Sequence, residues 1–138
     1  MPRISLFRGM PGSGKTEAAR KLQTRLGCML IEPDALLIQD GVYLYTPDRY
    51  AKARERCLNM VTDISLVGAD VVYADVLATV AEINRVIQSY CIGWAKPEIV
   101  VLDMPLLTVD ESMARNRHNV RREDVERMAR EWEPWEGQ

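Results

Sequence analysis

The stretch Gly9-Met10-Pro11-Gly12-Ser13-Gly14-Lys15-Thr16 decides the fold class of this 138-residue chain. It follows an apolar segment at residues 4–8 and precedes residues 17–26, where apolar side chains recur on one helical face. The pattern GxxxxGK(S/T) between a strand and a helix predicts a phosphate-binding loop. Glycines let backbone amides approach phosphate oxygens, and the positive end of the following helix attracts the same charge. We therefore expect a nucleoside triphosphate site here.

The loop also predicts which ligands are bound. Lys15 is expected to reach the β- and γ-phosphates of ATP, and the Thr16 hydroxyl is expected to bind Mg²⁺. The residues predicted to bind the nucleotide in this loop are Gly9, Pro11, Gly12, Ser13, Gly14, Lys15 and Thr16. The motif alone leaves open whether the phosphate acceptor is water or an alcohol.

Outside this loop, apolar strands and amphipathic helices alternate along the chain. Strands are expected at residues 4–8, 28–31, 71–75 and 99–102, and helices at 17–26, 46–67, after 79, after 108 and at 122–132. Residues 39–45 are expected to be a loop with a turn at Asp40-Gly41. Alternation of this kind predicts an α/β three-layer sandwich with a mostly parallel sheet. We expect one domain over residues 1–138.

Composition excludes several classes of protein. The net charge is −2, which argues against coating of nucleic acid by bulk positive charge. The three cysteines form no metal-binding pattern and suit a reducing compartment. No apolar run approaches the roughly 20 residues that span a bilayer. We expect a soluble cytoplasmic protein without a membrane partner, whose oligomeric state the sequence leaves open.

Carboxylates follow the predicted strands, at the edge where ligands bind in parallel sheets. Asp34 is predicted to be a general base that accepts the proton of an attacking hydroxyl, with a helix cap as the alternative. Asp75 is predicted to bind the metal or line the acceptor site, with a structural turn as the alternative. Asp103 fits a strand-end turn better, and Glu32 is a weaker candidate than Asp34.

Four arginines, Arg115, Arg117, Arg121 and Arg122, fall within eight residues. They predict a lid, at about residues 108–122, that folds over the ATP phosphates and stabilises the transferring phosphoryl group. The alternative is a solvated helical face with charge pairs four residues apart. We expect Arg115 to be catalytic and Arg115, Arg117 and Arg122 to bind the nucleotide, although spacing alone does not rank them. His118 alone is weak support for a site.

Several segments together resemble the polynucleotide-kinase-like group of P-loop kinases. These are the phosphate loop, Glu32-Pro33-Asp34, Gly41-Val42-Tyr43, Val72-Tyr73-Ala74-Asp75 and the segment from Ala114 through Asn119 to Val120. The resemblance implies a P-loop kinase fold with a helical lid. It also implies that Asp34 is the general base, Asp75 an acceptor-site carboxylate and Arg115 a lid arginine. The implied activity is transfer of the ATP γ-phosphate to a polynucleotide or nucleotide 5′-hydroxyl.

The chain departs from this group around the acceptor. Leu37 replaces an arginine that would contact the acceptor's phosphate, and Val76-Leu77 replace a polar pair. Two alternatives therefore stay open. One is a kinase of another small alcohol or modified nucleoside. The other is an ATP-binding regulatory module with little turnover, which would gain support if Asp34 pointed away from the phosphate loop.

Overall fold

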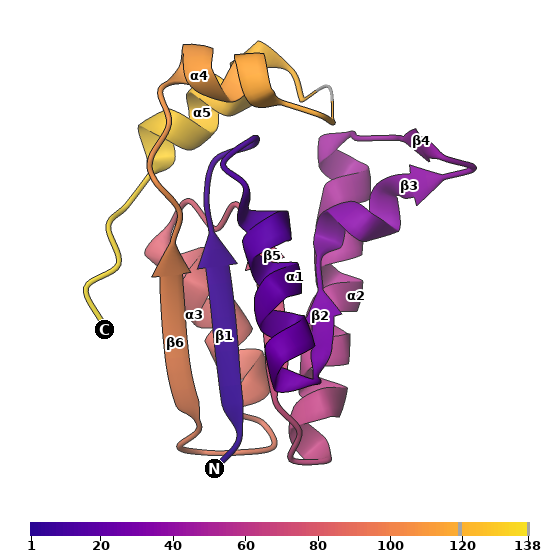
Figure 1. Cartoon of the computed structure of the whole chain (residues 1–138), viewed down its shortest axis with the longest axis vertical. Coiled ribbons are helices and arrows are strands. Elements are labelled where there is room, and N and C mark those ends of the chain that lie inside the picture. Colours follow the sequence, from indigo (N-terminus) through magenta and orange to yellow (C-terminus); the bar gives the residue numbers. More distant parts are fainter. Residues whose placement is uncertain (119, 138) are drawn as a thin grey trace.

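The computed structural model describes residues 1–118 and 120–137. Among these residues a four-stranded parallel sheet has the order β2-β5-β1-β6. Its strands are β1 (Arg3–Arg8), β2 (Met29–Ile31), β5 (Val71–Asp75) and β6 (Glu98–Asp103). All four run toward the same edge, where the phosphate loop follows β1 (Figure 1).

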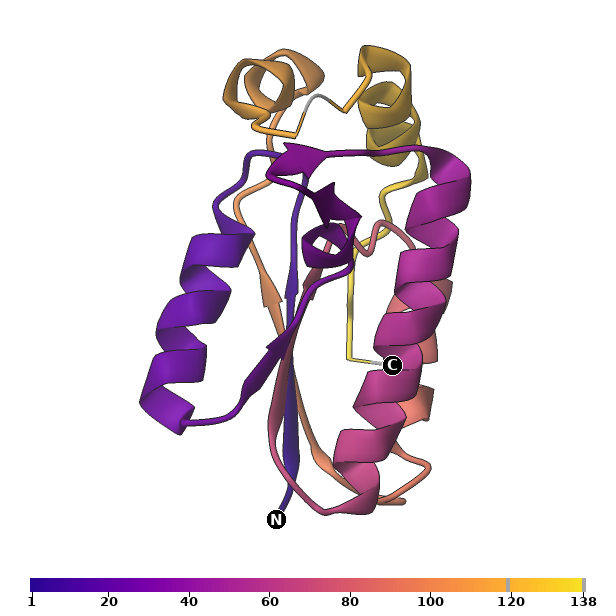
Figure 2. The same cartoon turned by 90° about the vertical axis from the view of Figure 1, so that its right-hand side faces the viewer.

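Helices cover both faces of this sheet. Figure 2 shows α1 (Lys15–Leu26) on one side and α2 (Pro47–Leu66) with α3 (Val80–Tyr90) on the other. The alternating strand side chains feed two cores, because successive residues of a strand point to opposite faces. Ile4 and Leu6 pack toward α2 and α3, whereas Phe7 packs toward α1. The predicted three-layer α/β sandwich is confirmed.

Two further helices, α4 (Val109–Arg115) and α5 (Arg122–Glu131), lie across the carboxyl edge of the sheet (Figures 1 and 2). A third apolar cluster, which includes Met10 of the phosphate loop and Val125 of α5, fixes them there. Thr108 and Glu111 form a capping box at the start of α4, where the sequence predicted a helix after residue 108. The packing places this helical layer directly above the predicted site.

The helices predicted from residue 46 and after residue 79 each begin at a threonine cap. The Thr46 hydroxyl accepts from the Arg49 amide to cap α2, and Pro47 occupies the first helical position. At α3 the Thr79 hydroxyl accepts from the Glu82 amide. No hydrogen bond from the Thr79 amide to the Glu82 carboxylate is found in residues 1–118 and 120–137: one carboxylate oxygen accepts from the Thr79 hydroxyl at 3.2 Å, and the other pairs with Arg54 at 2.9 Å.

The segment predicted as a loop at residues 39–45 contains a small β-hairpin. The 3₁₀-helix η1 (Pro33–Leu37) leads into β3 (Ile38–Gln39), which pairs antiparallel with β4 (Val42–Tyr43). Asp40 and Gly41 form the expected turn, with φ of 51° and 77°. These left-handed angles suit a two-residue hairpin, which turns the chain back toward the phosphate loop.

Every helix in the described ranges is too short or too polar to cross a lipid bilayer.

Candidate active site

The phosphate loop begins where β1 ends. Gly12 and Gly14 adopt left-handed φ of 81° and 86°, which other residues rarely tolerate. A Cβ on Gly12 would lie 2.7 Å from the Arg115 Cβ, so glycine also permits the close approach of α4. The Ser112 hydroxyl of α4 donates to the Pro11 carbonyl at 2.5 Å. The loop and α4 therefore form one packed unit.

Gly9 and Ser13, two of the residues predicted to bind the nucleotide, contact other parts of the protein. The cleft described below is lined by Pro11, Gly12, Gly14, Lys15 and Thr16, but not by Gly9 or Ser13. A Cβ on Gly9 would lie 2.3 Å from the Ser13 Oγ and 3.0 Å from the Met104 Cβ. The Ser13 amide donates to the Met10 carbonyl and closes the turn. Neither Gly9 nor Ser13 lines the cleft, and their contact with the nucleotide stays a prediction.

A cleft of about 810 Å³ opens in front of the loop. Lys15 lies on its floor and is 7% exposed. Burial lowers the pKa of the Lys15 ammonium, and the carboxylate of Asp34 is the strongest opposing influence. A buried lysine with neighbouring carboxylates provides a fixed positive charge for a phosphate.

The Thr16 hydroxyl donates to the Glu32 carboxylate at 2.9 Å. A hydroxyl that donates in this direction leaves its lone pairs free for a cation. Mg²⁺ prefers oxygen ligands and usually keeps several waters, so it needs few protein ligands. No group of three or more acidic, histidine or cysteine residues forms a metal cluster in the described chain. The Thr16–Glu32 pair therefore fits Mg²⁺ held jointly with nucleotide phosphates and water.

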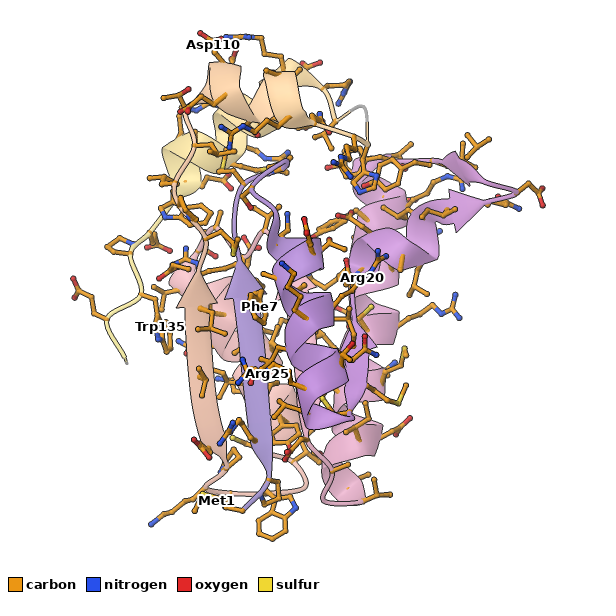
Figure 3. The ribbon with its side chains drawn as sticks, viewed as in Figure 1. Met1, Phe7, Arg20, Arg25, Asp110 and Trp135 are labelled. Atoms are coloured by element: carbon orange, nitrogen blue, oxygen red, sulfur yellow. The ribbon has the colours of Figure 1, made fainter. Side chains whose placement is uncertain are left out.

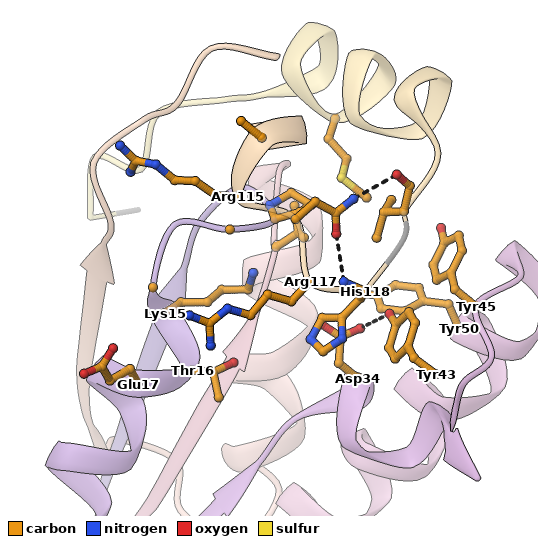
Figure 4. Close-up of a pocket in the computed structure, with 18 of the residues that line it drawn as sticks. Lys15, Thr16, Glu17, Asp34, Tyr43, Tyr45, Tyr50, Arg115, Arg117 and His118 are labelled. Carbon is orange, nitrogen blue, oxygen red and sulfur yellow. Dashed lines mark hydrogen bonds between the residues drawn. The ribbon is translucent and has the colours of Figure 1, made fainter. Parts of the chain in front are cut away.

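Asp34 sits in the first turn of η1 and lines the same cleft as Lys15. Its carboxylate accepts a 2.7 Å hydrogen bond from the Tyr43 hydroxyl (Figure 4). Burial, followed by the charge of Asp34, raises the pKa of the Tyr43 phenol, so Tyr43 stays a donor. This bond uses one side of the carboxylate and fixes its orientation. Asp34 therefore shares one cleft with the phosphate loop, and its charge is the strongest that acts on Lys15.

Asp75 occupies a different environment from the one predicted. It is 2% exposed, does not line the cleft, and accepts hydrogen bonds from the Tyr50 hydroxyl and the Val76 amide. Arg54 forms an ion pair with it at 3.6 Å. Burial raises the pKa of Asp75, and Arg54 opposes that shift. The geometry gives no support to Asp75 as a metal or acceptor ligand, because Tyr50 and Arg54 already occupy its carboxylate.

Two of the predicted lid arginines, Arg115 and Arg117, line the cleft. In Figure 4 the Arg117 side chain extends toward Lys15 and Thr16, whereas the Arg115 side chain extends away from them. Asn116 holds the segment between them, since its amide donates to the Val120 carbonyl and its oxygen accepts from the His118 amide. Asn119, which the prediction placed at this break, lies outside the described residues.

The other two arginines of the cluster face elsewhere. Arg122 pairs with Asp110 at 2.6 Å and with Glu126 at 3.2 Å, and it does not line the cleft. Asp110 marks the outer side of the helical layer in Figure 3, away from the phosphate loop. The predicted nucleotide contact of Arg122 therefore lacks support, because helical phase turns this residue outward. Arg121 pairs with Glu123 and Asp124.

An aromatic wall, which was not predicted from the sequence, lines the same cleft as the phosphate loop. Tyr43, Tyr45 and Tyr50 line the cleft, and the Tyr43 ring stacks on His118 at 4.3 Å between ring centroids. The alternation of Tyr43 and Tyr45 along an extended segment was the available signal. His118, weak as a single residue, joins the site because the hairpin brings Tyr43 to it.

The remaining strand-end carboxylate, Asp103, has a structural partner. It forms a 3.2 Å ion pair with Arg8, which is fully buried. Arg8 also donates to the carbonyls of Leu77, Ala78 and Glu133 and lies 4.1 Å from the centroid of the Trp132 ring. This arrangement agrees with the expected strand-end role of Asp103.

A strand, a glycine-rich loop with a buried lysine, and a helix at the carboxyl edge of a parallel sheet together define a P-loop kinase-like protein. The chain belongs to the family described as "AAA domain" (AAA_33), which matches residues 4–135. No curated protein gives a significant sequence match.

Solved structures with a similar fold include kinases. A chain of the Pnkp1/Rnl/Hen1 RNA repair complex is 17% identical with a TM-score of 0.71, over 94% of this chain and 43% of that chain. A gluconokinase from Sinorhizobium meliloti 1021 is 16% identical with a TM-score of 0.64, over 99% and 78%. A sugar kinase from Janibacter sp. HTCC2649 is 15% identical with a TM-score of 0.67, over 99% and 81%. The chain thus spans less than half of the repair-complex chain, and these likenesses establish the fold.

Proposed function

We propose that this protein is an ATP-dependent phosphotransferase that moves the γ-phosphate to a hydroxyl acceptor. The observation that carries the proposal is the shared cleft of Lys15 and Asp34. A cation for phosphate and an oriented carboxylate for a hydroxyl face one space, as direct transfer between two bound molecules requires. A regulatory module would need neither the orientation of Asp34 nor its position opposite the loop.

The proposed transfer proceeds in one displacement. The acceptor oxygen forms a bond to the γ-phosphorus while the bond from that phosphorus to the β–γ bridging oxygen breaks, and ADP leaves. The acceptor's proton passes to the free oxygen of Asp34, whose other oxygen is held by Tyr43. Lys15 and Arg117 neutralise the charge that develops on the phosphate oxygens.

Mg²⁺ would be held by the Thr16 hydroxyl together with the nucleotide, with Glu32 orienting that hydroxyl. When bound, the cation would neutralise phosphate charge. We also propose that α4, α5 and the segment between them act as the lid over the phosphates. A cytoplasmic location, where ATP is available and the three free thiols stay reduced, completes this proposal.

Two acceptor classes fit this chemistry. A polynucleotide or nucleotide 5′-hydroxyl is supported by the resemblance of the motifs and by aromatic rings that can stack on a base. A small alcohol or modified nucleoside is favoured by Leu37, which is 5% exposed and provides no charge for an acceptor phosphate.

The proposal is tested with γ-labelled ATP and Mg²⁺, offered with 5′-hydroxyl DNA, RNA, nucleosides, polyols or buffer. We expect label in at least one acceptor and none with Lys15→Ala, whose loss of phosphate binding should lower turnover at least about 10³-fold. Lys52→Ala, on the exposed surface of α2, is the matched control. Slow phosphate release without any labelled acceptor would identify the regulatory module instead.

A further inference from the structure

A second cavity, of about 180 Å³, adjoins the cleft on the side away from Lys15. The two cavities share four wall residues, Tyr45, Tyr50, Val76 and Met128. Its volume is about six times the roughly 30 Å³ that a water molecule occupies in the liquid. An acceptor whose hydroxyl meets Asp34 can therefore extend its body into this space.

The cations of the second cavity are already paired. Arg54 lies 2.9 Å from Glu82 and 3.6 Å from Asp75. Arg127, from α5, pairs with Asp124 at 3.4 Å. An incoming phosphate or carboxylate would therefore meet arginines whose charge is already partly neutralised by a neighbouring carboxylate.

The cavity also presents a carboxylate with no partner in the described part of the chain. Glu131 lines it and makes no hydrogen bond or ion pair with any of residues 1–118 or 120–137. This group repels anions and accepts hydrogen bonds from hydroxyl groups. The phosphate end of the cleft has the opposite character, since four cations line it: Lys15, Arg20, Arg115 and Arg117.

Three tyrosines line the cleft, and two of them, Tyr45 and Tyr50, also line the second cavity. The Tyr43 and Tyr50 hydroxyls already donate to Asp34 and Asp75. The Tyr43 and Tyr45 rings are nearly parallel, with 6° between their planes. Aromatic faces bind the apolar face of a ring while its hydroxyls remain free for polar partners.

From this separation of charge we propose that the acceptor is an uncharged polyhydroxylated molecule with one flat face, such as a sugar, sugar alcohol or nucleoside. Its reacting hydroxyl lies at Asp34 and a second hydroxyl donates to Glu131. This inference rests on the proposed phosphotransfer and narrows its acceptor. It places polynucleotides and other anionic acceptors among the poor substrates.

Matched acceptor pairs test the inference. We would measure kcat/KM with γ-labelled ATP for adenosine against adenosine 3′-monophosphate, and for glucitol against gluconate. Comparing adenosine with glucitol shows whether the uncharged acceptor is a nucleoside or a polyol. In the pair that is phosphorylated, we expect the uncharged member to be at least tenfold better. An anionic member, or a 5′-hydroxyl oligonucleotide, that is equal or better would overturn the inference.

A charge change at Glu131 provides the second test. Glu131→Gln should shift the ratio of kcat/KM values at least threefold toward the anionic member of the pair, because a repulsive charge is removed. Glu123→Gln makes the same change on the same helix but outside the cavity, and it should leave the ratio unchanged. A ratio that does not respond to Glu131→Gln would remove Glu131 from the acceptor site.

Different results would refute the acceptor inference and the phosphotransferase proposal. If label reaches acceptors but prefers anionic ones, only the inference is wrong. If ATP binds and no acceptor is labelled, the phosphotransferase proposal falls and the acceptor class falls with it.

Discussion

The ends of strands β2 and β5 look alike in the sequence and differ in the structure. Each strand is apolar, and each leads into acidic residues at the carboxyl edge of the sheet. Beyond β2, Glu32 meets the phosphate loop and Asp34 faces the cleft. At β5, Tyr50 and Arg54 of α2 cover Asp75. The position of a carboxylate at this edge brings it near the site, but the helix that packs above it decides whether it can act.

The largest expected effect is a loss of activity that distinguishes Asp34 from Asp75. Asp34→Asn should lower kcat about 10²- to 10⁴-fold, because the amide cannot accept the acceptor's proton. ATP affinity, measured by calorimetry, should stay within about twofold. Asp48→Asn, exposed on α2, is the control. Transfer at the wild-type rate would remove Asp34 as the base.

The same comparison applies to the arginines of the lid segment. Arg117→Ala should lower kcat about 10²-fold, the cost of removing one donor aimed at developing charge. Arg122→Ala deletes the same charge on the outer side of α5 and should change kcat less than about twofold. Arg115→Ala should fall between them, because Arg115 lines the cleft but points away from Lys15. A larger loss for Arg122 than for Arg117 would contradict the observed orientation.

We expect substitution of Asp75 to lower the stability of the protein. Asp75→Asn weakens the contacts with Arg54, Tyr50 and the Val76 amide, and we expect it to lower the free energy of unfolding by about 2 kcal/mol. That loss is about 30-fold in the folding equilibrium constant. Denaturant unfolding would measure it, with Asp34→Asn as the matched variant at an accessible site. Unchanged stability together with lost Mg²⁺ dependence would restore the metal role predicted from the sequence.

Glu32 should give the smallest effect. Glu32→Ala frees the Thr16 hydroxyl to rotate, and we expect the affinity for Mg²⁺–ATP to fall about tenfold. Affinity for ATP without Mg²⁺ should change little. Binding titrations with and without the metal check both, with Asp63→Ala on exposed α2 as the control. Equal losses in both titrations would argue for a structural role of Glu32.

The fold and the phosphate end of the cleft could be predicted because the sequence features that specify them are local. The phosphate loop, the strand alternation and the caps at Thr46 and Thr108 each depend on a few neighbouring residues. The β3–β4 hairpin escaped prediction because each of its strands has only two residues. A ladder that short is specified by its turn more than by any alternation of side chains.

The partners of the two carboxylates could not be predicted from the sequence. Tyr50 and Arg54 of α2 contact Asp75, whereas Glu32 contacts the Thr16 hydroxyl, and the functional role of each stays a prediction. Arg117 and Arg122 are five positions apart in one cluster, yet only Arg117 faces the cleft. The first outcome depends on how α2 packs, and the second on the path of the segment between α4 and α5; charge spacing in a sequence specifies neither.

The buried side chain of Arg8 has a mechanical consequence. Arg8 directly precedes the phosphate loop. Its guanidinium donates to the carbonyl of Glu133, just beyond α5, and lies over the Trp132 ring. A swing of α5 away from the sheet would have to uncover a charge that is now wholly shielded from water. The C-terminal end of this helix is therefore held against the sheet, and we expect any opening of the helical layer to begin nearer the N-terminal end of α5.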